Sequence, residues 1–302
     1  MTSTQRPRVG VIGLGAMGHG MASSLRRAGW APAVYDLRTE VAQVFAADGG
    51  RACASVAELA AGVEVLVSVV VNADQTEDVL FGTGGAAGVM VPGSVFVMCS
   101  TVDPNRSIAW ESRLAERGIH YVDAPISGGA AKAASGQMTM MTAARPEAYA
   151  RCAGVLDAMA AKVYRLGDQA GAGSKVKIIN QLLAGVHIAA AAEAMALGLR
   201  EGVDAAALYE VITHSAGNSW MFENRMAHVL AGDYTPLSAV DIFVKDLGLV
   251  LDTARATKFP LPLASTAHQM FMQASTAGHG REDDAAVIKI FPGITLPQGA
   301  NR

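Results

Sequence analysis

The feature that most constrains the fold is a glycine-rich turn close to the N-terminus. The short apolar run Val9–Ile12 leads directly into Gly13-Leu14-Gly15-Ala16-Met17-Gly18, and a helical pattern follows. In this strand–turn–helix setting, glycines permit a tight turn and let a pyrophosphate approach the backbone, while the helix N-terminus stabilises negative charge. The segment therefore predicts a dinucleotide-binding turn, the alternative being a plain glycine-rich loop.

Asp36 extends this prediction to the identity of the dinucleotide. It directly follows the next apolar run, Ala33–Tyr35. A carboxylate at the end of this strand bonds both ribose hydroxyls of NAD and repels the 2′-phosphate of NADP. Arg38 nearby keeps NADP open as an alternative. We expect NAD as the cofactor, held by the six residues of the glycine turn and by Asp36.

Short apolar runs alternate with helical patterns as far as about Leu166. This alternation is typical of βαβ units around a parallel sheet. Ser55 with Glu58, and Asp74 with Glu77, have the spacing of helix N-terminal capping pairs. The further runs are Val63–Val71, Ser94–Cys99, Ile119–Val122 and Met138–Thr142.

After Gly167 the strand-like runs disappear and helical patterns take over. Ser174 to about Arg200 predicts one helix of roughly 40 Å at 1.5 Å per residue, ended by Gly202. We expect an α/β protein in which residues 1–167 form a doubly wound Rossmann-type parallel sheet and residues 168–302 an all-α domain, joined by this long interdomain helix. The remaining helical patterns are Ala205–His214, Ser219–Leu230, Ala239–Ala256 and Leu263–Ala277.

Composition narrows the partners. Apolar residues make up 51% of the 302 residues and the formal net charge is −3, which predicts a small-molecule partner and neither nucleic acid nor a membrane surface. The three cysteines lack metal-ligand spacing, so we expect no metal site and reduced, buried thiols in a cytoplasmic protein. His187 and Glu193 argue against reading the long alanine-rich helix as a membrane span. We interpret it as a buried helix, and the apolar surplus of the helices predicts a homodimer or homotetramer.

Ligands of an open parallel sheet bind beyond the carboxyl ends of its strands. Three segments follow such ends: Val71-Asn72-Ala73, Ser100-Thr101-Val102 and Asp123–Gly129. Any one of them alone is more often an ordinary loop. The third is more specific, because Ser127, Gly128 and Gly129 offer a hydroxyl and accessible backbone amides that can hold a carboxylate.

A candidate catalytic residue lies at the start of the long helix. Helical spacing puts Lys177, Asn180 and Gln181 on one face, one turn after Ser174. From spacing alone, a solvated lysine is an equal alternative. Oxidation of an alcohol by NAD needs a base for the hydroxyl proton, and burial near a positive helix end lowers the pKa of a lysine towards neutrality. Lys177 is therefore predicted to transfer the proton.

Taken together, these motifs give the chain a resemblance to the β-hydroxyacid dehydrogenase family that covers essentially its whole length. Its marks are Gly13–Gly18, the Asp-Ala-Pro-x-Ser-Gly-Gly segment Asp123–Gly129, the GxGxxxKxxN pattern from Gly171 to Asn180, and Lys245-Asp246. Four motifs in this order are far more specific than any one of them. Lys245-Asp246 taken alone would read as an exposed helical pair.

The resemblance implies roles for individual residues. Lys177 resembles the catalytic lysine and Asn180 a substrate ligand, while Ser127, Gly128 and Gly129 would hold the acid group. Val71 and Asn72 would line the cofactor, and Thr101 would contact the nicotinamide ribose. Lys245 would close over the cofactor. Asp246 would orient Lys245 or reach the substrate.

The chain departs from the family pattern in three places. Asn72-Ala73 stands where relatives often have a proline, Ala143-Ala144 replaces a glycine pair, and Gln181 replaces a common asparagine. These departures concern the loop geometry and the substrate contacts.

Three segments are most similar to family members that oxidise a four-carbon sugar acid at its C2 hydroxyl, as in L-threonate. They are Gly128–Ala133, His214–Arg225 and Glu282–Lys289. Alternatives within the fold are oxidation of 3-hydroxyisobutyrate, reduction of tartronate semialdehyde, an imine reductase, for which a residue other than lysine is expected at position 177, and a non-catalytic scaffold.

Overall fold

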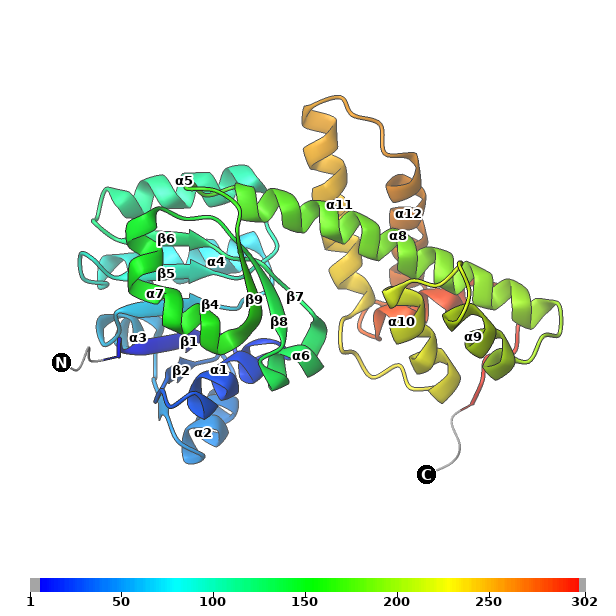
Figure 1. The fold of residues 1–302 in the computed structure, drawn as a ribbon, viewed down its shortest axis with the longest axis horizontal. Coiled ribbons are helices and arrows are strands. Elements are labelled where there is room, and N and C mark those ends of the chain that lie inside the picture. The colour runs from blue at the N-terminus through cyan, green and yellow to red at the C-terminus, as the bar shows by residue number, and fades with distance from the viewer. Residues whose placement is uncertain (1–5, 299–302) are drawn as a thin grey trace. The chain divides into compact units, whose positions relative to one another are not determined.

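The computed structural model describes residues 6–298. The chain forms two compact units, Met1–Lys177 and Ile178–Arg302 (Figure 1). The division falls inside the long helix α8 (Ala172–Arg200). The domain boundary expected after residue 167 stays a prediction.

The first unit is built on a six-stranded sheet, parallel throughout. Its strand order is β3-β2-β1-β4-β5-β6, which reverses direction between β1 and β4 and confirms the doubly wound Rossmann-type prediction. β1, β4 and β5 are fully buried, which is why they read as continuous apolar runs. The strands are β1 (Val9–Ile12), β2 (Ala33–Tyr35), β3 (Arg51–Ala52), β4 (Val65–Ser68), β5 (Val95–Met98) and β6 (His120–Asp123).

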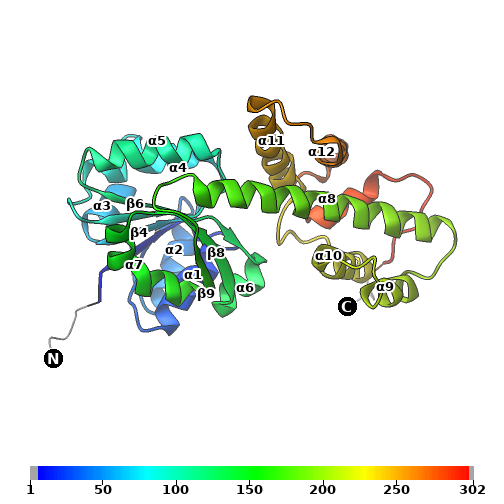
Figure 2. The ribbon, with the colours of Figure 1, turned by 45° about the horizontal axis from the view of Figure 1, so that its top comes forward.

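Successive side chains along a strand point to opposite faces, so two cores form, one on each face of the sheet. Val67 belongs to the core that also contains Leu25 of α1 (Gly18–Arg27), whereas Leu66 belongs to the core that contains Trp110 of α5 (Pro104–Ala115). Figures 1 and 2 show helices on both faces. The helices around this sheet are α1 (Gly18–Arg27), α2 (Thr39–Ala47), α3 (Val56–Ala61), α4 (Ala73–Phe81), α5 (Pro104–Ala115) and the 3₁₀ turn Ala86–Gly88.

One predicted helix cap is confirmed and the other was wrong. The Ser55 side chain accepts a hydrogen bond from the Glu58 backbone N–H at 3.1 Å and caps α3. At α4 the cap is Asn72, whose Oδ1 accepts from the Gln75 N–H at 2.9 Å, so the predicted cap Asp74 lies inside the first turn. Asn72 and Asp74 are both good capping residues, and pattern alone does not rank them.

The run Met138–Thr142 was expected in the parallel sheet and lies instead in a separate three-stranded sheet of order β7-β8-β9. A connection that adds the next strand parallel to the same sheet needs a dozen or more residues. Only two residues separate β6 from β7 (Ile126–Ser127), so β7 cannot continue the parallel sheet. The chain then passes through α6 (Gly129–Ser135) and pairs β8 (Met138–Thr142) antiparallel to β7. α7 (Pro146–Met159) and β9 (Ala160–Arg165) complete this part, which the sequence pattern did not predict.

The second unit is helical, as predicted. Its core includes Phe243 and Phe271, whose stacked rings lie 5.1 Å apart. A π-helical turn at Ser275–His279 and a 3₁₀ helix at Asp284–Ile290 were not predicted. Besides the greater part of α8, the helices are α9 (Ala205–Thr213), α10 (Trp220–Ala231), α11 (Val240–Ala256) and α12 (Pro262–Ala274).

Helix α8 was predicted to be buried, and this holds for one face. Ile188 and Met195 are fully buried, but Ile179 and Leu197 are more than half exposed. By length and composition alone the helix is apolar enough to cross a membrane, and 39% of its most apolar stretch is buried within the chain.

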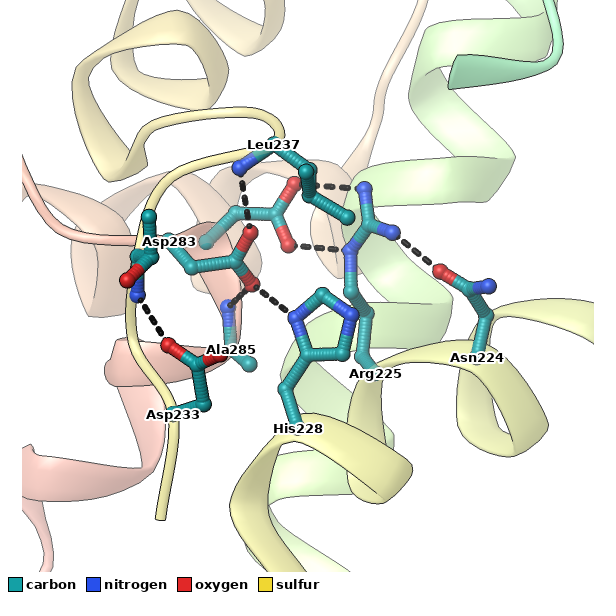
Figure 3. A network of polar contacts seen from close by, with 9 residues as sticks. Asn224, Arg225, His228, Asp233, Leu237, Asp283 and Ala285 are labelled. Atoms are coloured by element: carbon teal, nitrogen blue, oxygen red, sulfur yellow. Dashed lines mark hydrogen bonds and ion pairs between the residues drawn. The ribbon is translucent and has the colours of Figure 1, made fainter. Parts of the chain in front are cut away.

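Buried charges join α10 to the start of the 3₁₀ helix Asp284–Ile290 and to its N-cap residue Asp283. The Arg225 guanidinium pairs with both oxygens of Asp284, and His228 Nδ1 lies 3.1 Å from Asp283 Oδ1. Asp283 also accepts from the backbone N–H groups of Leu237 and Ala285, and these contacts converge on its carboxylate in Figure 3. Because both carboxylates are fully buried, losing one partner would leave an uncompensated charge.

We predict that the His228–Asp283 pair makes stability depend on pH. The hydrogen bond that His228 donates to the Asp283 carboxylate raises the pKa of His228 above 6.5. The contribution of the pair to stability is therefore complete below pH 6.5 and is lost as the pH rises through the higher folded value. His228→Gln should therefore reduce the free energy of unfolding by about 1 kcal/mol more at pH 6 than at pH 9. Urea denaturation at both pH values measures this difference.

His214→Gln is the matched control, because His214 is exposed and contacts the backbone carbonyl of Glu210. An equal loss at both pH values for His228→Gln would contradict the ion pair.

Candidate active site

The glycine turn is fixed to the end of the neighbouring strand by two hydrogen bonds. The Gly13 N–H donates to the Tyr35 carbonyl at 2.9 Å, and the Leu14 N–H donates to Asp36 Oδ2 at 2.7 Å. The turn therefore lies at the carboxyl ends of β1 and β2, next to the point where the strand order reverses. This is where open α/β sheets bind their ligands.

The three glycines of the turn are required for different reasons. A Cβ on Gly18 would lie 1.8 Å from the Gly13 carbonyl oxygen, and one on Gly13, whose φ is +87°, would lie 2.7 Å from the Val69 carbonyl oxygen. A Cβ on Gly15 would meet no atom of the described chain within 4 Å. Packing within the protein thus explains Gly13 and Gly18, whereas Gly15 leaves space at the start of α1 for an incoming group.

The N-terminus of α1 suits a phosphate. Among the described residues, no side chain caps it, since its N-cap residue is Met17. The first N–H groups of a helix have no partner within the helix and carry partial positive charge. Together with the space over Gly15, this arrangement fits the pyrophosphate of a dinucleotide.

Asp36 is held as a carboxylate at the end of β2. Burial raises its pKa, but hydrogen bonds from the Arg38 side chain and backbone and from the Leu14 N–H outweigh burial, so the net pKa lies below its usual value. Arg38 Nε lies 3.1 Å from Asp36 Oδ1, and the Arg38 side chain remains 57% exposed. The same carboxylate therefore orients the glycine turn and carries the negative charge that can accept hydrogen bonds from a ribose.

The predicted cofactor contacts Val71, Asn72 and Thr101 follow the carboxyl ends of β4 and β5. Val71 is 50% exposed, although it is apolar. The Ser100 hydroxyl donates to the Val70 carbonyl at 2.7 Å and ties these two loops together. Asn72 Oδ1 caps α4. Any contact of Asn72 with the cofactor would therefore use its other atoms.

The segment predicted to hold a carboxylate is packed against the cofactor helix. Ser127 is followed by Gly128 and Gly129, which have φ angles of +134° and +74° and start α6. A Cβ on Gly20 of α1 would lie 2.6 Å from the backbone of Ala133 in α6. Gly20 was not predicted to matter, and its only signal in the sequence is its place one turn before the small residue Ser24.

Ser24 strengthens the same contact. Its hydroxyl donates to the Ala133 carbonyl at 3.1 Å. The helix that follows the cofactor turn is thus packed directly against the helix that follows the predicted substrate segment.

Asp123, at the end of β6, holds the first turn of α8. Its Oδ2 accepts from the N–H groups of Gly171 at 2.8 Å and Ser174 at 2.9 Å, and its Oδ1 accepts from the Ser174 hydroxyl at 2.6 Å. Burial raises the pKa of Asp123, and these hydrogen bonds oppose that rise without cancelling it. A Cβ on Gly173 would lie 2.4 Å from the Met141 carbonyl oxygen, so the turn fits closely against the strands.

Lys177 lies one turn after Ser174 and is buried, with 7% of its surface exposed. It is the last residue of the first unit. Its position relative to the sheet therefore follows from the contacts of Asp123 with the start of α8. Lys177 was predicted as the catalytic residue, whereas Asp123 was named only as the first residue of the Asp123–Gly129 segment.

The other predicted site residues belong to the second unit. Asn180 and Gln181 lie on α8, and Lys245 and Asp246 lie on α11. Gln181 Nε2 donates to Asp246 Oδ2 at 2.5 Å, Asn180 Nδ2 donates to Gln181 Oε1 at 3.0 Å, and Lys245 Nζ lies 2.5 Å from Asp246 Oδ1. Gln181 departs from the family pattern, and in the structure its side chain links Asn180 to Asp246.

Comparison with known proteins identifies the family. Residues 8–167 match the model for the NAD binding domain of 6-phosphogluconate dehydrogenase, and residues 171–291 match that for the NAD-binding of NADP-dependent 3-hydroxyisobutyrate dehydrogenase. The chain belongs to the β-hydroxyacid dehydrogenase family. It is an oxidoreductase that binds NAD or NADP.

Relatives are similar over nearly the whole chain. L-threonate dehydrogenase of Cupriavidus necator is 69% identical over 96% of this chain and 97% of its own length, and that of Escherichia coli K12 is 54% identical over 96% of each. The crystal structure of a 3-hydroxyisobutyrate dehydrogenase from Salmonella typhimurium has a TM-score of 0.90 at 55% identity and covers 94% of this chain and 99% of that one.

We predict that two substitutions in the glycine turn separate stability from cofactor binding. Gly18→Ala should reduce the free energy of unfolding by about 1–3 kcal/mol, because its methyl group overlaps the Gly13 carbonyl. Gly15→Ala should unfold like the wild type and bind NAD about tenfold more weakly, because its methyl group occupies the path of the pyrophosphate. Thermal unfolding and calorimetric titration with NAD measure the two effects. Unchanged NAD affinity in Gly15→Ala would contradict the phosphate cradle.

A second prediction concerns Asp123. Asp123→Ala leaves two backbone N–H groups and the Ser174 hydroxyl without their acceptor, so the free energy of unfolding should fall by about 2–4 kcal/mol. Asp123→Asn, which keeps one acceptor oxygen, should lose less stability and still show a lower kcat than the wild type. Asp157→Asn, at an exposed position on α7, is the control. Urea denaturation and steady-state kinetics test the pair, and a wild-type kcat in Asp123→Asn would show that Lys177 does not depend on this contact.

Proposed function

We propose that the protein oxidises L-threonate at its C2 hydroxyl to 2-dehydro-L-erythronate with NAD as the hydride acceptor. The observation that carries the proposal is the 69% identity to L-threonate dehydrogenase of Cupriavidus necator over 96% of the chain. Lys177, Asn180 and the Ser127–Gly129 segment, which the family resemblance assigns to the reaction, are all present in the chain.

The chain's own residues account for cofactor binding. The space over Gly15 and the uncapped start of α1 would receive the pyrophosphate, and Asp36 would accept hydrogen bonds from the adenosine ribose. NAD supplies the acceptor for the hydride when it is bound. The charge of Asp36 favours NAD over NADP, because a 2′-phosphate would meet a carboxylate.

Lys177 acts as the general base in this proposal. Its amine takes the proton of the C2 hydroxyl as the hydride leaves the same carbon. The contacts of Asp123 and Gly173 hold the start of the helix that carries Lys177, so this turn of α8 has a defined position relative to the strand ends. The Ser127 hydroxyl and the backbone N–H groups of Gly128 and Gly129 would hold the substrate carboxylate, and Asn180 would bond a substrate hydroxyl.

A second candidate substrate is 3-hydroxyisobutyrate. The observation that favours it is the high similarity to the Salmonella typhimurium structure described as a 3-hydroxyisobutyrate dehydrogenase. Reduction of tartronate semialdehyde is a further alternative of the same chemical class. Cytoplasmic location and assembly as a homodimer or homotetramer stay predictions.

The substrate assignment is tested by following the reduction of NAD with L-threonate, 3-hydroxyisobutyrate and glycerate. The value of kcat/KM should be highest for L-threonate. Activity confined to 3-hydroxyisobutyrate would overturn the assignment while leaving the reaction class in place. Parallel assays with NADP measure the cofactor preference attributed to Asp36.

The base is tested by Lys177→Met, which keeps the length of the side chain and removes the amine. The value of kcat should fall by about 10²–10⁴-fold, which is the usual contribution of a general base. Lys175→Met on the same helix is the matched control, because Lys175 is exposed. Undiminished turnover in Lys177→Met would exclude Lys177 as the base whatever the substrate.

A further inference from the structure

Two buried hydroxyl groups join the loops that follow β4 and β5. Thr76 lies in the first turn of α4 and Ser100 lies just after β5, and their side-chain oxygens are 3.2 Å apart. The Ser100 oxygen is also 2.7 Å from the Val70 carbonyl oxygen, and the Thr76 oxygen is 2.9 Å from that of Asn72. Thr76 is fully buried and Ser100 is 3% exposed. Buried hydroxyls are costly unless they are hydrogen-bonded.

The number of protons gives these contacts a direction. Two hydroxyls carry two protons, so only two of the three contacts are hydrogen bonds at one time. Ser100 donates its proton to the Val70 carbonyl, which is the shortest of the three contacts. Thr76 is then the donor between the two hydroxyls, and its backbone N–H, at 3.1 Å, already serves the Asn72 carbonyl. We call the sequence from Thr76 to Ser100 to the Val70 carbonyl the hydroxyl bridge.

The loop after β4 is the fixed end of the hydroxyl bridge. The Val71 N–H donates to Gln75 Oε1 at 2.8 Å, and the Gln75 N–H donates to Asn72 Oδ1 at 2.9 Å. The loop and the first turn of α4 therefore hold each other in place. On its other side the loop packs against the glycine turn, because a Cβ on Gly13 would lie 2.7 Å from the Val69 carbonyl oxygen.

We propose that Thr76 is a positioning residue for the cofactor, which holds Thr101 at the nicotinamide ribose by fixing Ser100, the residue before it. Thr76 is fully buried, so it acts through Ser100 and not by touching the cofactor. A ribose ligand whose neighbour is bonded to a fixed backbone carbonyl loses little freedom when the dinucleotide binds. The proposal rests on the predicted role of Thr101 and is independent of which hydroxy acid is oxidised.

The test measures binding by calorimetric titration with NAD and with ADP, so it needs no turnover. Thr76→Val keeps the shape of the side chain and removes the donor of the hydroxyl bridge. Its Kd for NAD should rise about five- to tenfold, the usual effect of one buried hydrogen bond. ADP has the adenosine and the pyrophosphate but lacks the nicotinamide ribose. Its Kd should stay within about twofold of the wild-type value.

Two further variants separate positioning from a general loss of stability. Thr76→Ser keeps the hydroxyl and should bind NAD within about twofold of the wild type. Thr142→Val makes the same change at another fully buried threonine, whose oxygen lies 2.8 Å from both the Tyr149 hydroxyl and the Tyr164 carbonyl. It should lower the melting temperature about as much as Thr76→Val does and leave the affinity for NAD unchanged.

Ser100→Ala removes the second link of the hydroxyl bridge and should show the same selective loss of NAD affinity. Because both hydroxyls act in one sequence, the double variant Thr76→Val/Ser100→Ala should bind NAD no more weakly than Ser100→Ala alone. If Thr76→Val does not fold, Ser100→Ala decides by the same comparison of NAD with ADP.

Three outcomes would overturn the proposal. One is wild-type affinity for NAD in both Thr76→Val and Ser100→Ala. Another is an equal loss of affinity for ADP and NAD, which would show that the hydroxyls support the whole binding domain and not the nicotinamide end. The third is a double variant whose loss equals the sum of the two single losses, which would show that Thr76 does not act through Ser100.

Discussion

The first unit depends on one buried carboxylate. Asp123 ends β6 and accepts three hydrogen bonds from Gly171 and Ser174 at the start of α8. Burying a carboxylate is costly unless hydrogen bonds replace its water, and here the positive end of a helix adds to them. Asp123 is paired in register with Met98 of β5. The sheet therefore determines the position of the start of α8, and with it the position of the Lys177 backbone one turn later.

The same sheet positions the two other parts of the proposed site in this unit. The glycine turn is bonded to the end of β2 through Tyr35 and Asp36. The Ser127–Gly129 segment is held by α6, which contacts α1 so closely that Gly20 admits no side chain. In each of these contacts at least one partner is a backbone group, whose position does not depend on a side-chain rotamer. A site that must align a hydride acceptor, a carboxylate and a base gains its accuracy from such contacts.

The positions of strands and helices could be predicted from local patterns in the sequence. Contacts between residues far apart in the chain could not. Apolar runs located the central strands, and helical periodicity located α8 to α12 to within about two residues at most ends. Periodicity does not name the neighbour of a strand, so Met138–Thr142 was assigned to the wrong sheet. Asp123 lay inside a recognised motif, but its role depends on a helix that starts 49 residues later. Gln181 stood out only as a departure from the asparagine of relatives, because its hydrogen bond to Asp246, 65 residues away, is not visible in the local pattern.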